Sequence, residues 1–239
     1  MSIKNIESHT SSEVVSEGFL NKTPERTIKI KITGDEAFLT VESIINQHGN
    51  MPFEWALPIP VADAELLMNL CRLESKVAIH AFSNEENQEI ERKFLVSGPF
   101  PTNGLSERIA QGYLNSSPDR TVRVRLKGDK AFITIKGIGN DTGMSRFEWE
   151  KEISVVAAEL LMPLCEPGAI IKTRHYVDVN GSLYEVDSFK GENLGLVIAE
   201  IELTSEDQPF ARPDWLGQEV TGNPQYYNSA LTKKPFLKW

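Results

Sequence analysis

The chain has 239 residues, of which 40% are hydrophobic, enough for one large domain or two small ones. Its formal net charge of −9 and isoelectric point of about 5.1 argue against a nucleic-acid-binding protein, which usually presents a basic surface. No apolar run is long enough to span a membrane, and the polar start of the chain lacks the apolar core of a secretory signal. Two cysteines give neither a disulfide framework nor a metal-binding spacing, so we expect a cytoplasmic protein.

The first pattern along the chain is an internal repeat. The chain matches itself without a gap when it is shifted by 94 residues, so that Gly18 falls on Gly112. Roughly half of the positions from 18 to 71 are identical, far beyond chance for an ungapped register. Cys71 and Cys165 are equivalent, which favours a packing role for both. The matching blocks are Pro24–Lys31 with Pro118–Arg125, Phe53–Trp55 with Phe147–Trp149, and Ala64–Met68 with Ala158–Met162.

The N-terminal copy is incomplete and has lost charge. Nothing upstream of it corresponds to 89–93 or to 182–203. The changes from the second copy to the first are Lys127 to Thr33, Lys136 to Glu42, Glu150 to Ala56, Lys172 to Ala78 and Arg174 to His80. We therefore predict a non-catalytic partial repeat at 1–83, a linker at 84–88 and a complete catalytic domain at 89–239. A half-barrel leaves unpaired strand edges, so we expect it to pack on the catalytic barrel or on a second chain, as a homo-oligomer.

The next pattern is the sequence Glu89-Ile90-Glu91-Arg92-Lys93. Successive side chains of a β-strand point to opposite faces, so Glu89, Glu91 and Lys93 share one face. Charged side chains are rarely placed in such a row without partners. This strand therefore indicates a polar surface that carries both acids and bases.

Further segments downstream repeat this alternation. The expected strands are Thr121–Leu126, Ala131–Lys136, Phe147–Ile153, Ile170–Val177, Leu183–Phe189 and Val197–Leu203, with a hairpin turn at Lys127–Lys130 and a short helix at Ala157–Leu164. The charges that share a face are Arg123 with Arg125, Glu148 with Glu150 and Glu152, Lys172 with Arg174, Glu185 with Asp187, and Glu200 with Glu202. This pattern is typical of an antiparallel meander.

One alternative is an ordinary sheet with a solvated charged face, the commoner situation for any single strand. Such a face usually mixes signs to gain cross-strand pairs, whereas like charges here are segregated by strand. A closed barrel with a polar interior explains the pattern better. Arginine and lysine bind phosphate oxygens, and Mg²⁺ or Mn²⁺ prefers carboxylate and phosphate oxygen, so such a lumen suits a metal-bound polyphosphate.

The complete unit resembles the CYTH superfamily, the triphosphate tunnel metalloenzymes. The resemblance begins with Glu89-x-Glu91-x-Lys93 and covers essentially all of 89–239. The ordered motifs after it are Gln111–Leu114, Arg123-x-Arg125, Thr134-x-Lys136, Glu148-x-Glu150, Lys172-x-Arg174, Tyr184-Glu185-x-Asp187, Glu200-x-Glu202, and a tail at 213–231. The resemblance implies an eight-stranded antiparallel β-barrel tunnel with short helices, which the partial copy of the same unit precedes.

The resemblance also implies roles for individual residues. The implied phosphate ligands are Lys93, Arg123, Arg125, Lys136, Lys172 and Arg174, and the implied metal carboxylates are Glu89, Glu91, Glu200 and Glu202. The resemblance also implies three further acids that either support these ligands or bind a second metal, namely Glu148, Glu150 and Asp187. Tyr113 is expected near Lys136, with a part in proton transfer, so that the expected catalytic group is Glu89, Glu91, Lys93, Tyr113 and Lys136.

These expectations favour a Mg²⁺- or Mn²⁺-dependent triphosphatase that cleaves tripolyphosphate to pyrophosphate and phosphate. Cyclisation of ATP and hydrolysis of nucleoside or thiamine triphosphates stay open as alternatives on the same fold. A non-catalytic polyphosphate-binding module is the alternative of a different class. His175 and Ser182 do not suggest a nucleophilic pair, because His175 is out of phase with Lys172 and Arg174 and should face away from the lumen.

Overall fold

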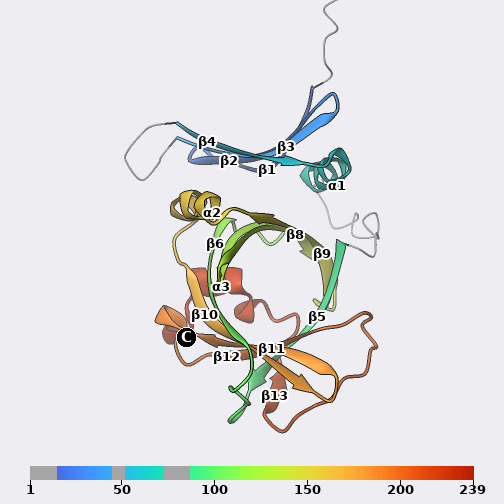
Figure 1. Ribbon diagram of the computed structural model, residues 1–239, viewed down its shortest axis with the longest axis vertical. Helices are drawn as coiled ribbons and strands as arrows, with labels where there is room; N and C mark the ends of the chain where they lie inside the picture. The colour runs from blue at the N-terminus through green and yellow to red at the C-terminus, as the bar shows by residue number, and fades with distance from the viewer. Residues whose placement is uncertain (1–14, 45–51, 73–86) are drawn as a thin grey trace, which may run out of the picture. The chain divides into compact units, whose positions relative to one another are not determined.

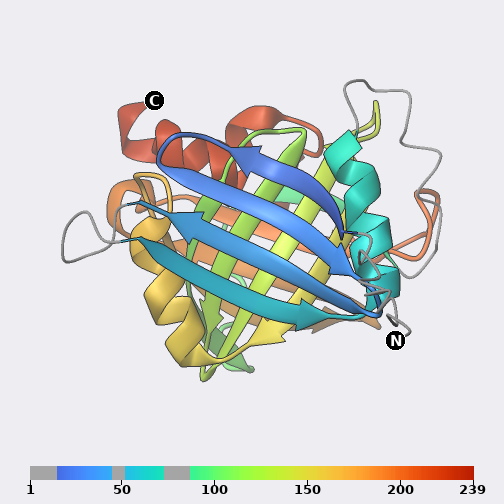
Figure 2. The same cartoon turned by 90° about the horizontal axis from the view of Figure 1, so that it is seen from above.

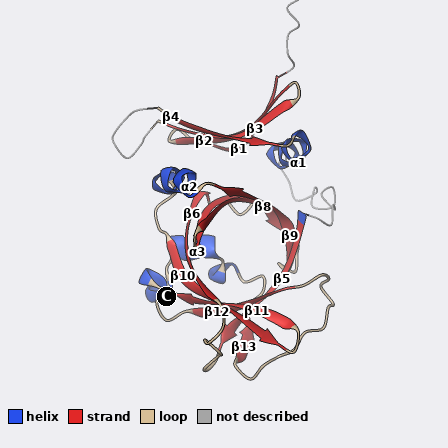
Figure 3. Ribbon diagram, in the orientation of Figure 1, coloured by secondary structure: helices blue, strands red, loops and turns tan. Residues whose placement is uncertain are grey.

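A computed structural model describes residues 15–44, 52–72 and 87–239, which form two compact units. Both units consist mostly of β-strands, with a few short helices (Figure 3). The expected mainly β fold is confirmed. Within these residues, no helix combines the length and the apolar character needed to cross a membrane.

The first unit is a four-stranded antiparallel sheet with one helix (Figure 2). Its elements are β1 (Val15–Lys22), β2 (Arg26–Thr33), β3 (Glu36–Ser43), β4 (Phe53–Ile59) and α1 (Val61–Arg72). The strands pair in chain order, and α1 packs against β1, β2 and β3. As far as the described residues go, β1 and β4 are the two edges of this sheet.

The second unit is a closed barrel of eight antiparallel strands, seen as a ring in Figure 1. Its strands are β5 (Gln88–Val96), β6 (Ser106–Asn115), β7 (Arg120–Lys127), β8 (Lys130–Gly139), β9 (Ser145–Ile153), β10 (Ile170–Val179), β11 (Ser182–Phe189) and β12 (Val197–Glu202). The first strand closes the ring, because β5 pairs with β9 on one side and with β12 on the other.

This pairing order differs from the simple meander that the sequence suggested. Strands β6–β9 form one meander and β10–β12 form another, and the two are joined where β10 pairs with β6. A short ninth strand, β13 (Leu216–Glu219), pairs with β5 outside the ring. Neither β6 nor β13 was predicted from the sequence, because both carry fewer regularly alternating charges than the other strands.

The helices of the second unit are short. They are α2 (Val155–Leu161) and α3 (Asn228–Lys233), with 3-10 turns at Met162–Leu164, Gly191–Asn193, Pro224–Tyr226 and Phe236–Lys238. Helix α2 starts two residues before the expected position, because the Ser154 hydroxyl accepts a hydrogen bond from the Ala157 backbone N–H and caps the helix. Met162 to Leu164 continues it as the 3-10 turn, with Pro163 in its first turn.

The two units share details that support the repeat. A β-bulge separates Phe19 from Asn21 in β1, and another separates Tyr113 from Asn115 in β6, again 94 residues apart. A Cβ atom added to Gly18 would lie 2.8 Å from Cβ of Cys71. The equivalent distance from Gly112 to Cβ of Cys165 would be 2.9 Å. In both units the glycine therefore lets the cysteine pack closely on the strand, as the packing role predicted.

An apolar core lies on the outside of the barrel. Phe94, Tyr184 and Trp215 are buried together on the outer side of β5 and β11, and the ring of Trp215 meets Tyr184 edge-on at 5.3 Å. The segment around Trp215 is thereby fixed on the barrel, and its neighbour β13 is hydrogen-bonded to β5. Charged side chains are consequently left for the inner face.

One end of the lumen is apolar. Ile170, Phe189 and Ile198 form a buried cluster with Leu231 of α3. Ile170 is two residues from Lys172 and points to the same face of β10, so apolar packing replaces the charged lining at this end. The charged chemistry is confined to the rest of the barrel.

The boundary between the two units falls partly outside the residues that the structure describes. Of the expected linker at 84–88, residues 84–86 lie outside the described residues, and Gln88 is already the first residue of β5. Ala78 and His80, two of the charge losses, also lie outside them. The other three substituted positions, Thr33, Glu42 and Ala56, lie on the four-stranded sheet.

Candidate active site in the barrel lumen

The barrel encloses a cavity of about 540 Å³ whose wall is dominated by charged side chains. Its basic lining residues are Lys93, Arg123, Arg125, Lys127, Lys136, Arg146, Lys172 and Arg174, and its acidic lining residues are Glu89, Glu91, Glu148, Glu150, Glu185, Glu200 and Glu202. Closure of the sheet brings these charges to one lumen, because each strand turns alternate residues inward. The predicted inward orientation of Arg123 and Arg125, opposite Glu200 and Glu202, is therefore found.

The charges of β5 and β12 are paired with each other. Glu200 faces Lys93 in the strand register, and its carboxylate lies 2.5 Å from the Lys93 ammonium. Glu91 lies 2.9 Å from the same ammonium. Although burial raises the pKa of Glu200, the positive charges of Lys93, Lys172 and Arg174 hold it well below its usual range. Glu200 is thus a carboxylate at any pH near neutrality.

Arg146 on β9 joins the two glutamates of β5. Its Nε atom donates to Glu89 at 2.8 Å, and one terminal nitrogen donates to Glu91, also at 2.8 Å. Arg146 was not predicted as a site residue from the sequence, although it alternates with Glu148 and Glu150 and so had the phase of a lumen residue. Its guanidinium holds the two glutamates of the Glu-x-Glu motif in one geometry.

Lys136 bridges two carboxylates with different pKa values. Its ammonium lies 2.7 Å from Glu89 and 2.7 Å from Glu148. Burial raises the pKa of Glu89, but Lys136 and Arg146 more than offset this and lower it well below its usual range. Burial and the nearby charge of Glu89 raise the pKa of Glu148 to about 7. Glu148 can therefore gain or lose a proton near neutral pH.

The basic pair of β7 is held by Glu150. Arg125 lies 2.7 Å from the Glu150 carboxylate, Arg123 lies 3.3 Å from it, and the Thr134 hydroxyl donates to it at 2.6 Å. The Nε atom of Arg123 is buried without a hydrogen-bond partner among the described residues. The two guanidinium groups thus retain donor capacity for an anion in the lumen.

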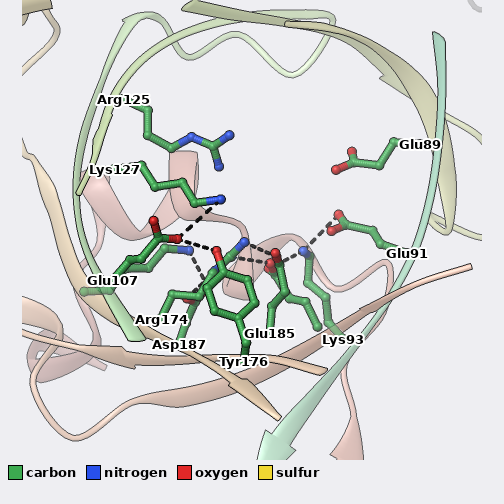
Figure 4. Close-up of polar contacts among 12 residues, drawn as sticks. Glu89, Glu91, Lys93, Glu107, Arg125, Lys127, Arg174, Tyr176, Glu185 and Asp187 are labelled. Carbon is green, nitrogen blue, oxygen red and sulfur yellow. Dashed lines mark hydrogen bonds and ion pairs between the residues drawn. The ribbon is translucent and has the colours of Figure 1, made fainter. Parts of the chain in front are cut away.

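Lys172 and Arg174 of β10 share Asp187 of β11. The Lys172 ammonium is ion-paired with Asp187, and Arg174 lies 2.6 Å from the same carboxylate and 2.9 Å from Glu200. Arg174 also pairs with Glu185. Burial lowers the pKa of Lys172 to about 8. Asp187 is fully buried behind these bases, so it supports them from the wall (Figure 4).

Glu202 differs from the other predicted metal carboxylates. Burial and the negative charges of Glu185, Glu89 and Glu91 raise its pKa. The acidic wall is thus crowded with carboxylates near Glu202. Even so, the part of the chain that the structure describes contains no group of three or more acidic, histidine or cysteine side chains arranged to hold a metal ion. Glu89, Glu91 and Glu200 are engaged by basic side chains instead.

Tyr113 lies in a smaller adjoining cavity of about 40 Å³, beside the start of α3. Lys93, Arg123 and Lys136 line this cavity as well, so Tyr113 and Lys136 face a common space. Burial raises the pKa of Tyr113, which therefore keeps its proton. Its oxygen accepts a hydrogen bond from Gln111 at 3.2 Å, which leaves the hydroxyl hydrogen available to a ligand.

His175 and Ser182 lie apart from this chemistry. The His175 ring packs edge-on against Phe100 at 5.4 Å, on the outside of β10. The Ser182 hydroxyl accepts a hydrogen bond from the Ala211 backbone N–H. The expectation that His175 faces away from the lumen is confirmed.

Comparison with known proteins gives one family. The family model described as the CYTH domain matches residues 87–235. An inorganic triphosphatase of Acetivibrio thermocellus is 48% identical over 151 residues, which is 62% of this chain and 96% of that protein. An inorganic triphosphatase of Nitrosomonas europaea is 41% identical over 148 residues, 60% of this chain and 95% of that protein. A crystal structure of an inorganic triphosphatase has 36% identity and a TM-score of 0.46, and the match covers 60% of this chain and 93% of that one.

Proposed function

Because this chain belongs to the CYTH domain family, we propose that its barrel hydrolyses inorganic tripolyphosphate to pyrophosphate and phosphate. The observation that carries the proposal is the lumen itself, a cavity of about 540 Å³ lined by eight basic and seven acidic side chains. Guanidinium and ammonium groups on one wall suit the oxygens of a polyphosphate. The relatives that match almost their whole length are inorganic triphosphatases, which supports the same reaction.

The proposed phosphate ligands are the basic side chains that sequence motifs had singled out. They are Lys93, Arg123, Arg125, Lys136, Lys172 and Arg174. All six are wholly or partly buried, and ion pairs hold them in the lumen wall in the absence of substrate. Such preorganised charge stabilises a phosphoryl-transfer transition state, in which negative charge spreads over the transferred group.

The family implies a divalent metal, and the acidic wall fits one in its chemistry. Hard cations such as Mg²⁺ and Mn²⁺ prefer carboxylate oxygens, and the crowded charges that raise the pKa of Glu202 would be relieved by a cation. We propose Glu89, Glu91, Glu200 and Glu202 as its ligands. Glu89, Glu91 and Glu200 contact Lys93, Arg146 or Arg174, so these ion pairs would have to open for the carboxylates to hold a cation.

Charge balance supports this need for a cation. The lumen carries nearly equal numbers of basic and acidic side chains, so it is close to neutral before anything binds. A tripolyphosphate brings several negative charges that the paired bases do not fully offset. A bound cation supplies the missing positive charge and polarises the phosphate oxygens.

In the proposed reaction, water attacks the terminal phosphorus in line with the bond to the leaving oxygen. The phosphorus–oxygen bond to the pyrophosphate unit breaks, and pyrophosphate leaves with the bridging oxygen. Glu148 is our candidate for the group that accepts the water proton, because its pKa of about 7 lets it take up a proton at neutral pH. Tyr113, which retains its proton, is proposed to donate a hydrogen bond to a phosphate oxygen in the smaller cavity.

We further propose that the N-terminal half-copy is not catalytic. Glu42 occupies the position equivalent to Lys136, and its carboxylate lies 2.7 Å from Lys29, the equivalent of Arg123. Lys29 is thereby neutralised on its own sheet. Lys31, the other base of that row, has Ala56 where Glu150 would be.

The test of the proposed function compares three substrates with the purified full-length chain. Phosphate release is measured from tripolyphosphate, ATP and thiamine triphosphate, each with Mg²⁺, with Mn²⁺ and with excess EDTA. We expect tripolyphosphate to be hydrolysed fastest and EDTA to stop the reaction. Faster turnover of ATP, formation of cyclic AMP, or full activity in EDTA would each contradict the proposal.

A further inference from the structure

A cluster of three side chains at one mouth of the barrel lies outside the residues assigned so far. It consists of Glu107 on β6, Lys127 on β7 and Tyr176 on β10, and we name it the rim cluster (Figure 4). The Tyr176 hydroxyl donates to a Glu107 carboxylate oxygen at 2.7 Å. The Lys127 ammonium lies 3.6 Å from the same oxygen and 5.5 Å from the centre of the Tyr176 ring.

Lys127 extends a row of basic side chains that already serves the proposed substrate. Arg123, Arg125 and Lys127 alternate along β7, so all three face the lumen, and Lys127 lines the main cavity. Same-face residues of a strand are separated by about 7 Å. A group held by Lys127 would therefore lie about one such step beyond a group held by Arg125, toward the β7–β8 hairpin.

The rim cluster is built to hold Lys127 in a set position. The Lys127 side chain is 26% exposed, so it reaches solvent at the mouth while its ammonium is restrained by Glu107. Glu107 is in turn restrained by Tyr176. Burial and the hydrogen bond to Glu107 raise the pKa of Tyr176, so the hydroxyl remains a donor over the working pH range. The result is a positioned positive charge whose strength is reduced by one neighbouring carboxylate.

We propose that Lys127 binds a phosphoryl group beyond the third in a linear polyphosphate, and that Glu107 limits this contact. The inference rests on the proposed function and adds a substrate-length determinant to it. An additional phosphoryl group is the chemistry that a lysine one step outside a phosphate-binding row would recognise. A nucleobase fits less well, because the ammonium of Lys127 already lies over the Tyr176 ring, the aromatic surface of the cluster.

The two charged residues of the cluster give predictions of opposite sign. The measured quantity is kcat/KM for tetrapolyphosphate divided by kcat/KM for tripolyphosphate. Lys127→Ala should lower this ratio about fivefold, the factor that corresponds to about 1 kcal/mol. Glu107→Gln should raise it, because the Lys127 ammonium is then no longer neutralised. Lys130→Ala is the matched control, since Lys130 belongs to the same hairpin, is 59% exposed and contacts Glu152 instead.

An unchanged ratio in Lys127→Ala, or a lower ratio in Glu107→Gln, would overturn the inference. A change in the ATP to tripolyphosphate ratio alone would also overturn it, in favour of a nucleotide at the mouth. If the wild-type chain hydrolyses no polyphosphate, the proposed function fails by itself. Calorimetric binding of tetrapolyphosphate and tripolyphosphate to the wild type and the same variants then tests the role of Lys127 independently of turnover.

Discussion

Replacement of Arg146 tests how the acidic wall of the lumen is held. Arg146→Met keeps most of the side-chain volume and removes the guanidinium that contacts Glu89 and Glu91, both at 2.8 Å. These glutamate side chains are only 13% and 9% exposed, so they would lose a partner in a largely buried setting. Their mutual repulsion would then be opposed by Lys136 and Lys93.

The size of the stability effect follows from the remaining contacts. Removal of one partner from a buried ion pair costs about 3 to 5 kcal/mol. Glu89 keeps Lys136 at 2.7 Å and Glu91 keeps Lys93 at 2.9 Å, so the loss should be smaller. We expect the free energy of unfolding to fall by about 2 to 3 kcal/mol. For a chain of this size that corresponds to a decrease in Tm of about 5 to 10 °C.

Binding measurements separate this role from simple packing. Without Arg146, Glu89 and Glu91 have one competitor fewer, so Mn²⁺ titrated calorimetrically without substrate should bind more tightly than to the wild type. Tripolyphosphate titrated without metal should bind more weakly, because the lumen has lost a positive charge. Arg146→Lys is the control, since it keeps the charge but not the two-pronged contact. Unchanged Mn²⁺ affinity together with unchanged stability in Arg146→Met would refute the reasoning.

Three further predictions concern the metal ligands, the repeat and the outer strand. Glu200→Ala should reduce tripolyphosphate turnover by at least about 100-fold, while the circular dichroism spectrum stays native. The control is Glu152→Ala, which changes an exposed carboxylate paired with Lys130 and should leave turnover intact. Equal activity of the two variants would contradict the assignment of Glu200. Gly112→Ala places a Cβ atom 2.8 Å from Sγ and 2.9 Å from Cβ of Cys165, and it should destabilise the barrel by about 1 to 3 kcal/mol in urea unfolding. The same change should cost less in a Cys165→Gly background, which lacks both of these atoms. Burial raises the pKa of Glu219, but hydrogen bonds from Arg92 and Thr221 outweigh it and lower the pKa. The Glu219 carboxylate therefore stabilises the folded state at pH values above its unfolded pKa of about 4.5. In thermal unfolding at a series of pH values, the stability difference between wild type and Glu219→Gln should shrink as the pH falls below that value. A difference that does not change with pH would exclude this linkage.

The sequence by itself determined most of the barrel strands and which of their side chains share a face. Alternation with a period of two is a local property, so the charged pairs on 123 and 125, 172 and 174, or 200 and 202 could be assigned to one surface without a structure. The repeat likewise identified Gly112 and Cys165 as a packing pair, because their equivalents at Gly18 and Cys71 survive in the half-copy.

Strands with a weaker pattern escaped prediction. β6 carries Glu107, Gln111 and Tyr113 in phase, but these are too varied in type to look like a charged row. Arg146 and Lys127 had the correct phase but were not predicted as lumen residues, because each lies at the end of a row that contains better-known motif residues. Their lumen position could have been inferred from alternation alone.

Only the tertiary structure decided how the charges are partnered. Segregation of acids and bases by strand is explained by pairing across strands, as in Glu200 with Lys93 and Glu150 with Arg125. Closure through β5 also could not be derived locally, since it joins residues more than 50 positions apart, such as Glu89 and Arg146. The register and partners of a strand depend on long-range hydrogen bonding, which the period of two leaves undetermined.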